Sequence, residues 1–348
     1  MEKLLVLLHT EPDGTLPKSA LESLAAALDT AGSLGGAELA VGIVGHGAAA
    51  AAGSIASCGT KRFLAVSGPD FDQARYGSDA AAAEAVCKAA GATLVLAPAT
   101  SRWCRVMAGV AHRIGGRSDS HVTALHADVG SVKVTRWFYR QRFEAVLSRP
   151  ERPWILLLDP GCHAPWEGAV GSPTAAVTPE DVVVAVSTEA KRTAVTGLKA
   201  PSAGEQTIRP DAKLLFVAGA GWTKKQPDGR THVPEAESLI LGFMGKSQAS
   251  LGGSKSIVDM SGEGQATFKF MTHLNQVGQT GATPRHPKGL STCCHGEEPH
   301  VVGWRFVGER RAVNLDPACG WAQGKTDVLY VADAFAVMAK VNELLSPS

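Results

Sequence analysis

The sequence predicts an α/β protein of two domains, and three observations lead to this prediction. Its length of 348 residues exceeds the roughly 250–300 residues at which a single hydrophobic core stops growing. Short apolar runs of strand length alternate with Ala-rich helical segments in the N-terminal half. A second set of strand-like runs, closed by a periodic helix, follows a polar segment rich in Lys, Thr, Ser, Pro and Gly.

The N-terminal half predicts a mostly parallel sheet, because strands and helices that alternate along the chain form βαβ units. The expected strands lie at residues 4–8, 39–44, 62–66 and 93–97, and the expected helices at residues 19–31, 48–56 and 80–90. The helical pattern then disappears, and strand candidates follow one another at residues 133–137, 144–147 and 154–158. We therefore expect an antiparallel extension of this sheet.

The second half predicts another α/β domain. Residues 181–186 form a last strand-like run of the first domain, and the polar segment after it is the expected linker. The expected boundaries are residues 1–195 for the first domain, 196–212 for the linker and 213–348 for the second domain. Strands are expected at residues 213–218, 311–314 and 328–331. A closing helix is expected at residues 333–345, where apolar side chains repeat at helical spacing.

Composition and charge argue against several classes of protein. The net charge of +1 is too small for the broad basic surface of a nucleic-acid-binding protein. No apolar stretch approaches the roughly 20 residues of a membrane span, and the short apolar start lacks a signal-peptide cleavage site, so we expect a cytoplasmic protein. The seven cysteines include no Cys-x-x-Cys pair, which disfavours a disulfide framework and a zinc ribbon. We interpret Cys293 and Cys294 as small buried residues of a loop.

Two polar groups in the first domain carry weak functional signals. Arg102, Trp103 and Arg105 follow an expected strand end, where they indicate either a crevice or partner contact or a capped helix start. Two histidines and two aspartates lie close together farther along, but their spacing fits no particular metal geometry, so we expect polar decoration of a strand. These four residues are Asp119, His121, His126 and Asp128.

Two glycine-rich segments in the second domain are weak signals when each is taken alone. Gly219 and Gly221 follow an expected strand and allow a tight turn that approaches a ligand, although the third glycine of a dinucleotide-binding fingerprint is missing. The simpler interpretation is a strand-ending turn. Residues 252–256 predict a second turn, which either cradles an anionic or electron-rich ligand or is merely solvated. They do not form a Walker motif.

Three motifs in the C-terminal third are more specific together. They are Gln276-Val277-Gly278-Gln279-Thr280-Gly281, His295-Gly296-Glu297-Glu298-Pro299-His300 and Val313-Asn314-Leu315-Asp316-Pro317. Their order and spacing resemble the flavin-binding domain of electron-transfer flavoprotein alpha subunits, whose Val-Gly-Gln-Thr-Gly sequence is matched without change. Residues 253–259 resemble the family's Gly-Ala-Ser-Arg segment leading into Val-Asp, and residues 94–100 its Val-Leu-Ala-Pro-Ala-Thr strand end. The resemblance thus covers nearly the whole chain.

This resemblance implies that the second domain is a doubly wound α/β domain that binds FAD. The residues assigned to the cofactor site are Gly219, Gly221, Ser254, Lys255, Val277, Gly278, Gln279, Thr280, Gly281, His295, Gly296, His300, Asn314, Asp333 and Ala334. His300 is expected to stabilise negative charge at the N1–C2=O edge of the flavin, and Gln279 and Thr280 to bond its N5–O4 side. Ser254 and the backbone at Gly296 are expected at the pyrophosphate or ribityl chain.

The remaining assignments include departures from the family pattern. Asn314, with Asp333 at the final helix start, is expected at the adenosine end. Lys255 stands where the family has arginine, which keeps the charge but loses a planar group that stacks on the flavin. Ala220 replaces the arginine of the glycine turn. Further replacements are His295 for serine, Pro299 for glutamine, and Glu297 and Glu298 for a small apolar pair. These departures suggest a specialised relative.

The resemblance implies an FAD-bound electron carrier rather than an enzyme with its own substrate. The expected partners are a beta-type subunit that carries AMP, a flavoprotein dehydrogenase as donor, with an N-methylated amine as candidate substrate, and a quinone reductase as acceptor. One alternative is a flavin-free or adenine-nucleotide-binding structural subunit of a larger oxidoreductase complex. Another is a flavin-dependent enzyme, although the sequence offers no evident acid–base pair.

Overall fold

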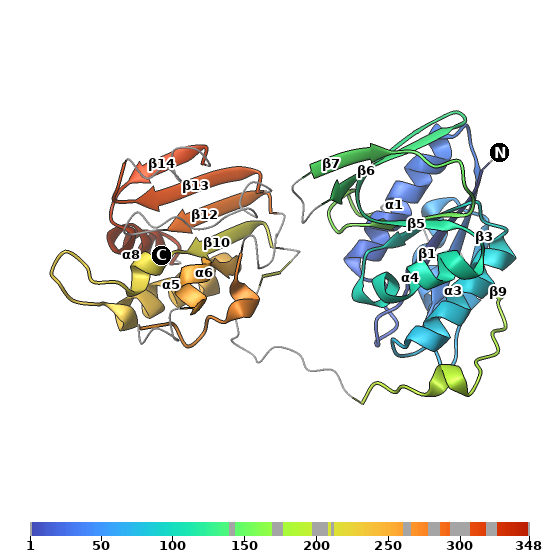
Figure 1. Ribbon diagram of the computed structural model, residues 1–348, viewed down its shortest axis with the longest axis horizontal. Coiled ribbons are helices and arrows are strands. Elements are labelled where there is room, and N and C mark those ends of the chain that lie inside the picture. The colour runs from blue at the N-terminus through green and yellow to red at the C-terminus, as the bar shows by residue number, and fades with distance from the viewer. Residues whose placement is uncertain are drawn as a thin grey trace. The chain divides into compact units, whose positions relative to one another are not determined.

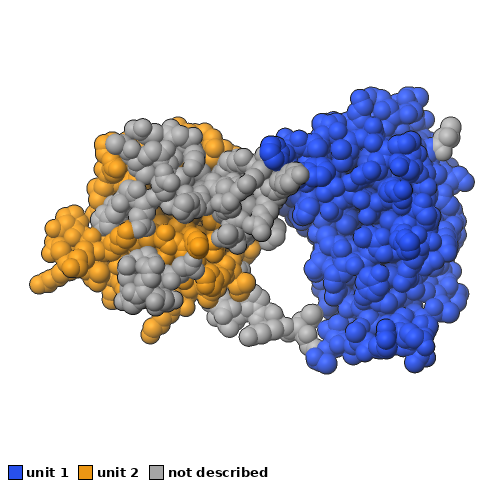
Figure 2. Space-filling view, viewed as in Figure 1, with its two compact units in different colours: residues 1–199 blue, residues 200–348 orange. Residues whose placement is uncertain are grey.

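The computed structural model describes residues 2–138, 143–168, 177–196, 208–209, 212–259, 266–277, 286–292, 307–317 and 326–346. The chain divides into two compact units, residues 1–199 and residues 200–348 (Figure 2). Each unit contains its own mostly or wholly parallel sheet with helices packed on it, which confirms the predicted α/β fold class.

The described strands of the first unit form one sheet in the order β7-β6-β5-β8-β4-β1-β2-β3-β9 (Figure 1). They are β1 (Lys3–His9), β2 (Glu38–Val44), β3 (Arg62–Val66), β4 (Leu94–Pro98), β5 (Arg117–Asp128), β6 (Ser131–Phe138), β7 (Phe143–Leu147), β8 (Trp154–Leu158) and β9 (Glu180–Asp181). The central strands are parallel, whereas β6 is antiparallel to both β5 and β7. The predicted antiparallel extension is therefore confirmed.

Helices cover both faces of the parallel part of this sheet. They are α1 (Lys18–Ser33), α2 (Ala48–Ser54), α3 (Tyr76–Ala90) and α4 (Ser101–Arg113). Leu4, Val6 and Leu8 of β1 belong to the core cluster that contains the buried residues of α1 and α2. Leu5 and Leu7 belong to the cluster that contains those of α3 and α4. A strand buried on both faces requires a continuous apolar run, which is the pattern that predicted β1.

The strand predicted at residues 181–186 is wrong beyond its first residue. Only Glu180–Asp181 pairs with β3, and the chain then continues without a named strand. Val182, Val184 and Val186 alternate along this segment and are half-buried against the α3–α4 core cluster. The alternating valines are therefore explained by packing of one side of an extended segment rather than by a sheet ladder.

The second unit contains a parallel sheet in the order β11-β10-β12-β13-β14. Its described elements are β10 (Leu214–Ala218), α5 (Val233–Ser247), β11 (Ser250–Gly253), α6 (Lys255–Asp259), β12 (Lys288–Thr292), β13 (Glu309–Asn314), β14 (Val328–Val331) and α8 (Ala334–Leu344). Phe216 and Ala218 pack with buried residues of α5 and α8, whereas Leu215 and Val217 belong to a separate cluster on the other face. This strand order is one of the two common doubly wound orders.

The prediction of a turn at residues 252–256 is wrong for Gly252 and Gly253, because both glycines belong to the end of β11. A Cβ atom on Gly252 would lie 2.5 Å from Val277 Cγ2, and one on Gly253 would collide with Met271. These glycines are therefore explained by close approach of neighbouring side chains to a buried strand. The turn proper begins at Ser254, directly before α6.

Candidate functional site

The predicted cofactor residues that the structure describes gather at one edge of the second sheet. Gly219 follows β10, Ser254 follows β11, Asn314 ends β13 and Asp333 follows β14. All these strands are parallel, so their carboxyl ends meet at the same edge. The chain order reverses between β10 and β12, and open α/β sheets bind ligands outside the carboxyl ends at such a switch point.

The glycine turn after β10 is attached to the end of β12, across the switch point. The Gly219 N–H donates to the carbonyl of Thr292 at 2.8 Å. Gly221 lies in the buried 3-10 turn Ala220–Thr223, and the Trp222 indole Nε1–H donates to Thr292 Oγ1 at 2.7 Å. Trp222 also packs on Phe335 of α8, with ring centroids 4.6 Å apart.

Trp222 and Thr292 are fully buried site residues that no sequence motif identified. The available signal was a tryptophan placed directly after a strand-ending glycine turn. Most buried indole N–H groups have a hydrogen-bond partner, and only the packed structure identifies Thr292 as the partner of Trp222. The bond holds both sides of the switch point together.

Replacing Trp222 with phenylalanine is expected to reduce the free energy of unfolding by about 2 kcal/mol, through one lost hydrogen bond and a small cavity. Urea unfolding measures this loss. Trp103→Phe is a matched control, because Trp103 is equally buried but its indole nitrogen has no hydrogen-bond partner among the described residues. Equal losses in the two variants would contradict the role of the Thr292 bond.

Ser254 and Lys255 form the turn between β11 and α6. The Ser254 N–H donates to the carbonyl of Ala218 at 3.0 Å, and its hydroxyl accepts the Ile257 N–H at 3.4 Å. Ser254 is buried, whereas Lys255 is exposed at the first residue of α6. The serine thus links the ends of β10 and β11, and the lysine supplies a cation at the carboxyl edge.

Val277 leads into the most specific motif from a position beside β11. Its N–H donates to the Gly253 carbonyl at 3.0 Å, Gln276 forms a parallel bridge with Gly253, and the valine side chain is buried. The chain therefore reaches residue 277 at the carboxyl edge of the sheet. The other predicted residues of this region lie outside the described part of the chain: Gly278, Gln279, Thr280, Gly281, His295, Gly296 and His300.

Asn314 has an unused donor at this edge. Its side chain is fully buried, and its Oδ1 accepts the Asp316 N–H at 3.2 Å. Its Nδ2 has no hydrogen-bond partner among the described residues. An unsatisfied buried amide costs about 1–3 kcal/mol, so the position fits a ligand that supplies an acceptor.

The predicted adenosine-end residues are brought together by the ends of β13 and β14. The Ala332 N–H donates to the Asn314 carbonyl at 3.2 Å, one residue before Asp333. Asp333 is exposed and caps α8, since its Oδ1 accepts the Phe335 N–H at 3.0 Å, and Ala334 is buried in the first turn. The helix N-terminus places backbone N–H groups at the carboxyl edge, where they favour an anionic group.

One histidine beside this edge has a perturbed pKa. His232 lies edge-on to Phe335 and contacts Asp228 at 2.8 Å and Glu235 at 3.3 Å. The hydrogen bond to Asp228 raises the pKa of His232 above its ordinary value, with the charges of Asp228 and Glu235 acting in the same direction. Asp228 and Glu235 thus stabilise the charged form of His232 relative to an isolated imidazole.

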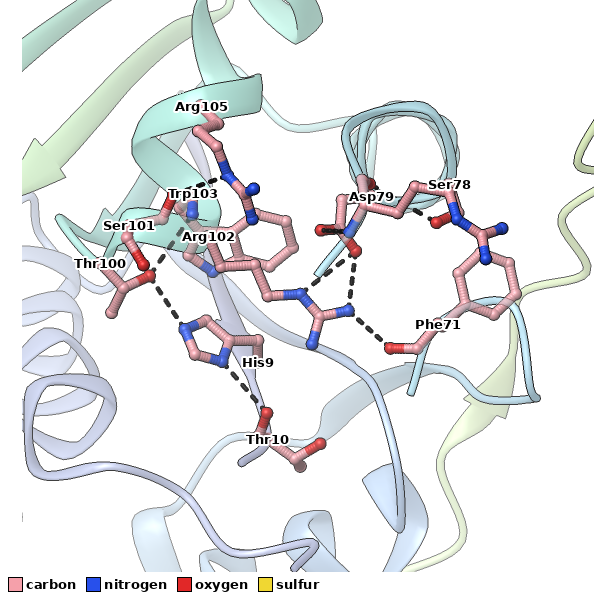
Figure 3. Close-up of polar contacts among 11 residues, drawn as sticks. His9, Thr10, Phe71, Ser78, Asp79, Thr100, Ser101, Arg102, Trp103 and Arg105 are labelled. Atoms are coloured by element: carbon pink, nitrogen blue, oxygen red, sulfur yellow. Dashed lines mark hydrogen bonds and ion pairs between the residues drawn. The ribbon is translucent and has the colours of Figure 1, made fainter. Parts of the chain in front are cut away.

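In the first unit, the partner-contact hypothesis is wrong for two of its three residues. Trp103 is fully buried, and Arg102 is buried in an ion pair with Asp79 (Figure 3). Thr100 caps α4, which confirms the capped helix start. Arg105 is exposed and donates to the Ser101 carbonyl at 3.1 Å.

Of the polar residues predicted to decorate β5, Asp119 forms a structural ion-pair cluster. Asp119 is buried and contacts Arg136 and Arg149. Across the described residues, no group of three or more His, Cys, Asp or Glu side chains is arranged to hold a metal ion. None of the described helices has both the length and the apolar content needed to cross a membrane.

The fold and site define a two-unit α/β protein whose second sheet gathers its candidate ligand-binding residues at the carboxyl edge. The model of the electron transfer flavoprotein domain matches residues 4–200, which is more than half of the chain. This chain therefore belongs to the electron transfer flavoprotein family. A search of curated proteins found no match.

Proposed function

We propose that this chain is an alpha-type electron-transfer flavoprotein subunit that binds FAD through residues 213–348, with residues 196–212 as linker. The observation that carries the proposal is the gathering of predicted cofactor residues at the switch-point edge of a doubly wound sheet. The unpaired Nδ2 of buried Asn314 supports it, because this donor needs an acceptor from outside the described residues.

Bound FAD would supply the redox chemistry, and the protein residues would bind and orient it. The turn at Gly219 and Gly221, Ser254 and the N-terminus of α8 offer the backbone N–H groups and the hydroxyl for the pyrophosphate and ribityl chain. Asn314 Nδ2, which has no partner among the described residues, would donate to the adenosine end. Lys255 would provide the positive charge that the family's arginine supplies to the flavin.

The residues outside the described part of the chain complete this proposal. His300 and His295 belong to the loop assigned to the N1–C2=O edge, and Gln279 and Thr280 are assigned to the N5–O4 side. Gly278, Gly281 and the backbone of Gly296 allow close approach to the cofactor.

The proposed partners follow from membership of the family. Residues 1–195 form the domain that contacts a beta-type subunit carrying AMP. A flavoprotein dehydrogenase, with an N-methylated amine as candidate substrate, delivers electrons, and a quinone reductase accepts them in the cytoplasm. Family members pass electrons between partner proteins, so the proposed function does not require a substrate pocket.

The test is to co-express the chain with its beta-type partner and measure the visible spectrum of the purified complex. A flavin spectrum that a flavoprotein dehydrogenase bleaches under anaerobic conditions would support the proposal. A colourless complex that retains only an adenine nucleotide would overturn it in favour of the structural-subunit alternative, which the departures at Ala220 and Lys255 motivate.

Asn314→Asp is expected to weaken FAD binding tenfold or more, which corresponds to about 1.4 kcal/mol, because it replaces the unpaired donor and keeps the acceptor used by Asp316. Titration of the apoprotein with FAD, followed by fluorescence quenching, measures the change. Asn342→Asp near the C-terminal end of α8 is the control, since the Asn342 amide donates to the Leu239 carbonyl. Unchanged FAD affinity in Asn314→Asp would refute the role of the amide.

A further inference from the structure

A segment of the first unit, residues 182–193, packs on α3 and α4 and is called the strap below. It follows β9 and contains the short 3-10 turn Glu189–Lys191, which lies against α3 (Figure 1). The alternating valines of its first half pack on the core cluster that contains the buried residues of α3 and α4. Near its other end, Lys191 Nζ pairs with Asp70 Oδ2 at 2.6 Å. The strap is therefore attached to the first unit near both of its ends.

Two glycines of these helices shape the space beside the strap. A Cβ atom on Gly77 in α3 would collide with the Ala190 carbonyl oxygen and lie 2.8 Å from Ala190 Cα, so the strap rests directly on the helix backbone. A Cβ atom on Gly109 in α4 would collide with the Tyr76 hydroxyl, so the Tyr76 side chain reaches from α3 to the backbone of α4. Each position therefore requires glycine.

The strap, the start of α3 and the last turn of α4 border a groove of about 460 Å³. Small-molecule sites typically have roughly 300–1,000 Å³ and a largely apolar lining. Ala81 and Ala185 supply apolar surface on α3 and on the strap. Tyr76 lines the groove and is 47% exposed, although its hydroxyl end lies against α4. An aromatic ring held in this way offers a surface for a flat apolar group.

Two arginines line the groove, Arg192 on the strap and Arg113 in the last turn of α4. Among the described residues, Arg192 donates one hydrogen bond, from Nε to the Glu189 carbonyl at 3.2 Å, which leaves both of its Nη groups unused. Arg113 Nη1 donates to Glu84 at 3.4 Å, and its other donors have no acceptor among the described residues. Guanidinium groups with unused donors suit a carboxylate or a phosphate.

The acidic residues beside the groove are already bonded. Glu84 of α3 is shared by two cations, since it lies 2.6 Å from Lys88 and 3.4 Å from Arg113. Hydrogen bonds from its own backbone N–H and from Ser187 lower the pKa of Glu189, whose carboxylate is therefore bonded within the strap. The α3–α4 side thus has one cation more than it has acids, and this surplus favours an anionic ligand.

We propose that this groove binds a small organic anion with a flat apolar part, whose anionic group pairs with Arg192 and whose flat part lies on Tyr76. Arg113 adds positive charge from α4. A carboxylate and a phosphate share this chemistry, because each accepts paired hydrogen bonds from a guanidinium. Since Arg192 belongs to the strap and Tyr76 to α3, the bound anion would bridge the two and hold the strap in place. The site uses residues of the first unit alone and is independent of the proposed flavin site.

The test uses the full chain as purified with the subunits and cofactor that accompany it, and phenyl phosphate and benzoate as probes. At least one probe is expected to bind, as measured by isothermal titration calorimetry, and to slow hydrogen exchange at residues 187–193. Inorganic phosphate is expected to bind more weakly than phenyl phosphate, because it lacks the ring. Tighter binding of phenyl phosphate identifies a phosphate ester as the ligand class, and tighter binding of benzoate identifies a carboxylate.

Arg192→Gln tests the proposed charge pairing. It is expected to weaken binding of the better probe about fivefold or more, while the unfolding temperature stays unchanged because Arg192 is exposed. Arg105→Gln is the matched control, since Arg105 is also exposed and donates its Nε to a backbone carbonyl, that of Ser101 at 3.1 Å, but does not line the groove. Equal affinities of the two variants, or no binding of either probe to the wild-type protein, would overturn the proposal.

Gly77→Ala tests the shape of the groove. The added methyl group is expected to displace the turn of the strap, to accelerate hydrogen exchange at residues 187–193 and to weaken binding of the better probe. Gly53→Ala in α2 is the control, since a Cβ atom there meets nothing within 4 Å. A Gly77→Ala variant that binds the probe as tightly as Gly53→Ala would place the bound probe elsewhere and refute this site.

Discussion

Replacement of Arg102 with methionine is expected to destabilise the protein by about 3–5 kcal/mol, because it leaves a buried carboxylate without its cation. Asp79 is completely buried, and Arg102 supplies the only cation paired with it among the described residues. Methionine fills much of the same volume but leaves the carboxylate with one hydrogen bond from the described residues, donated by the Arg75 N–H at 3.0 Å. Such a loss is a large part of the 5–15 kcal/mol that stabilises a typical domain.

Equilibrium urea unfolding measures this loss, and two further variants separate charge pairing from packing. Arg105→Met, on the same helix, removes an exposed arginine and is expected to cost less than about 0.5 kcal/mol. The double variant Arg102→Met/Asp79→Asn removes both charges and is expected to be more stable than Arg102→Met alone. A double variant less stable than Arg102→Met would show that the uncompensated carboxylate is not the cause.

Asp119→Asn is expected to destabilise the protein by about 3 kcal/mol, because one buried carboxylate joins the antiparallel extension to the parallel sheet. Asp119 on β5 accepts hydrogen bonds from Arg136 of β6 at 2.7 Å, from Arg149, and from the Trp154 indole of β8 at 2.9 Å. Asparagine keeps the shape but loses the charge. Arg136 and Arg149 are partly exposed, so water can solvate their charges once the Asp119 charge is gone. The expected loss of stability therefore lies at the lower end of the range for buried ion pairs.

The pH dependence of stability tests the same cluster. Burial alone raises the pKa of Asp119, but the hydrogen bonds from Arg149 and Trp154 and the Arg149 charge lower it below its ordinary value. A carboxylate with a lowered folded-state pKa adds stability above its unfolded pKa of about 3.9, and this stability is lost as the pH falls through the folded pKa. The stability difference between wild type and Asp119→Asn is therefore expected to be full at about pH 7 and to shrink below about pH 4.

Asp128→Asn is the control for this prediction, because Asp128 lies exposed at the end of the same strand. It is expected to leave both the stability and its acid dependence unchanged. Hydrogen exchange of β6 and β7 amides is expected to accelerate in Asp119→Asn and not in the control. A difference that persists unchanged to about pH 2 would contradict the assignment of the effect to the Asp119 charge.

The elements that the sequence predicted are those whose signal is local. The apolar run of β1, the Ala-rich helices α1 and α3 and the periodic helix α8 all occur where expected. The errors arose where one local pattern serves two structures. Alternating valines at residues 182–186 show the same pattern in a paired strand and in an extended segment that packs on helices. The two glycines of β11 suggest a turn by their residue type, but the structure requires them because neighbouring side chains approach the strand closely.

The candidate site also contains residues that local motifs predicted and contacts that only the folded chain revealed. Motif spacing was enough to select Gly219, Ser254 and Asn314, and the carboxyl edge of the second sheet gathers all three. The bond from Trp222 to Thr292 joins residues 70 positions apart, so no local pattern predicted it.

By itself, the sequence determined that this protein has two α/β units and resembles flavin-binding electron carriers, because side-chain periodicity and motif spacing are properties of neighbouring residues. The tertiary structure alone decided the strand orders, and with them the switch point of the second sheet. It also decided that Arg102 pairs with Asp79 and that Asn314 keeps a donor unused by the described residues. Burial and hydrogen-bond partners depend on which distant segments pack together, and only the folded chain determines that.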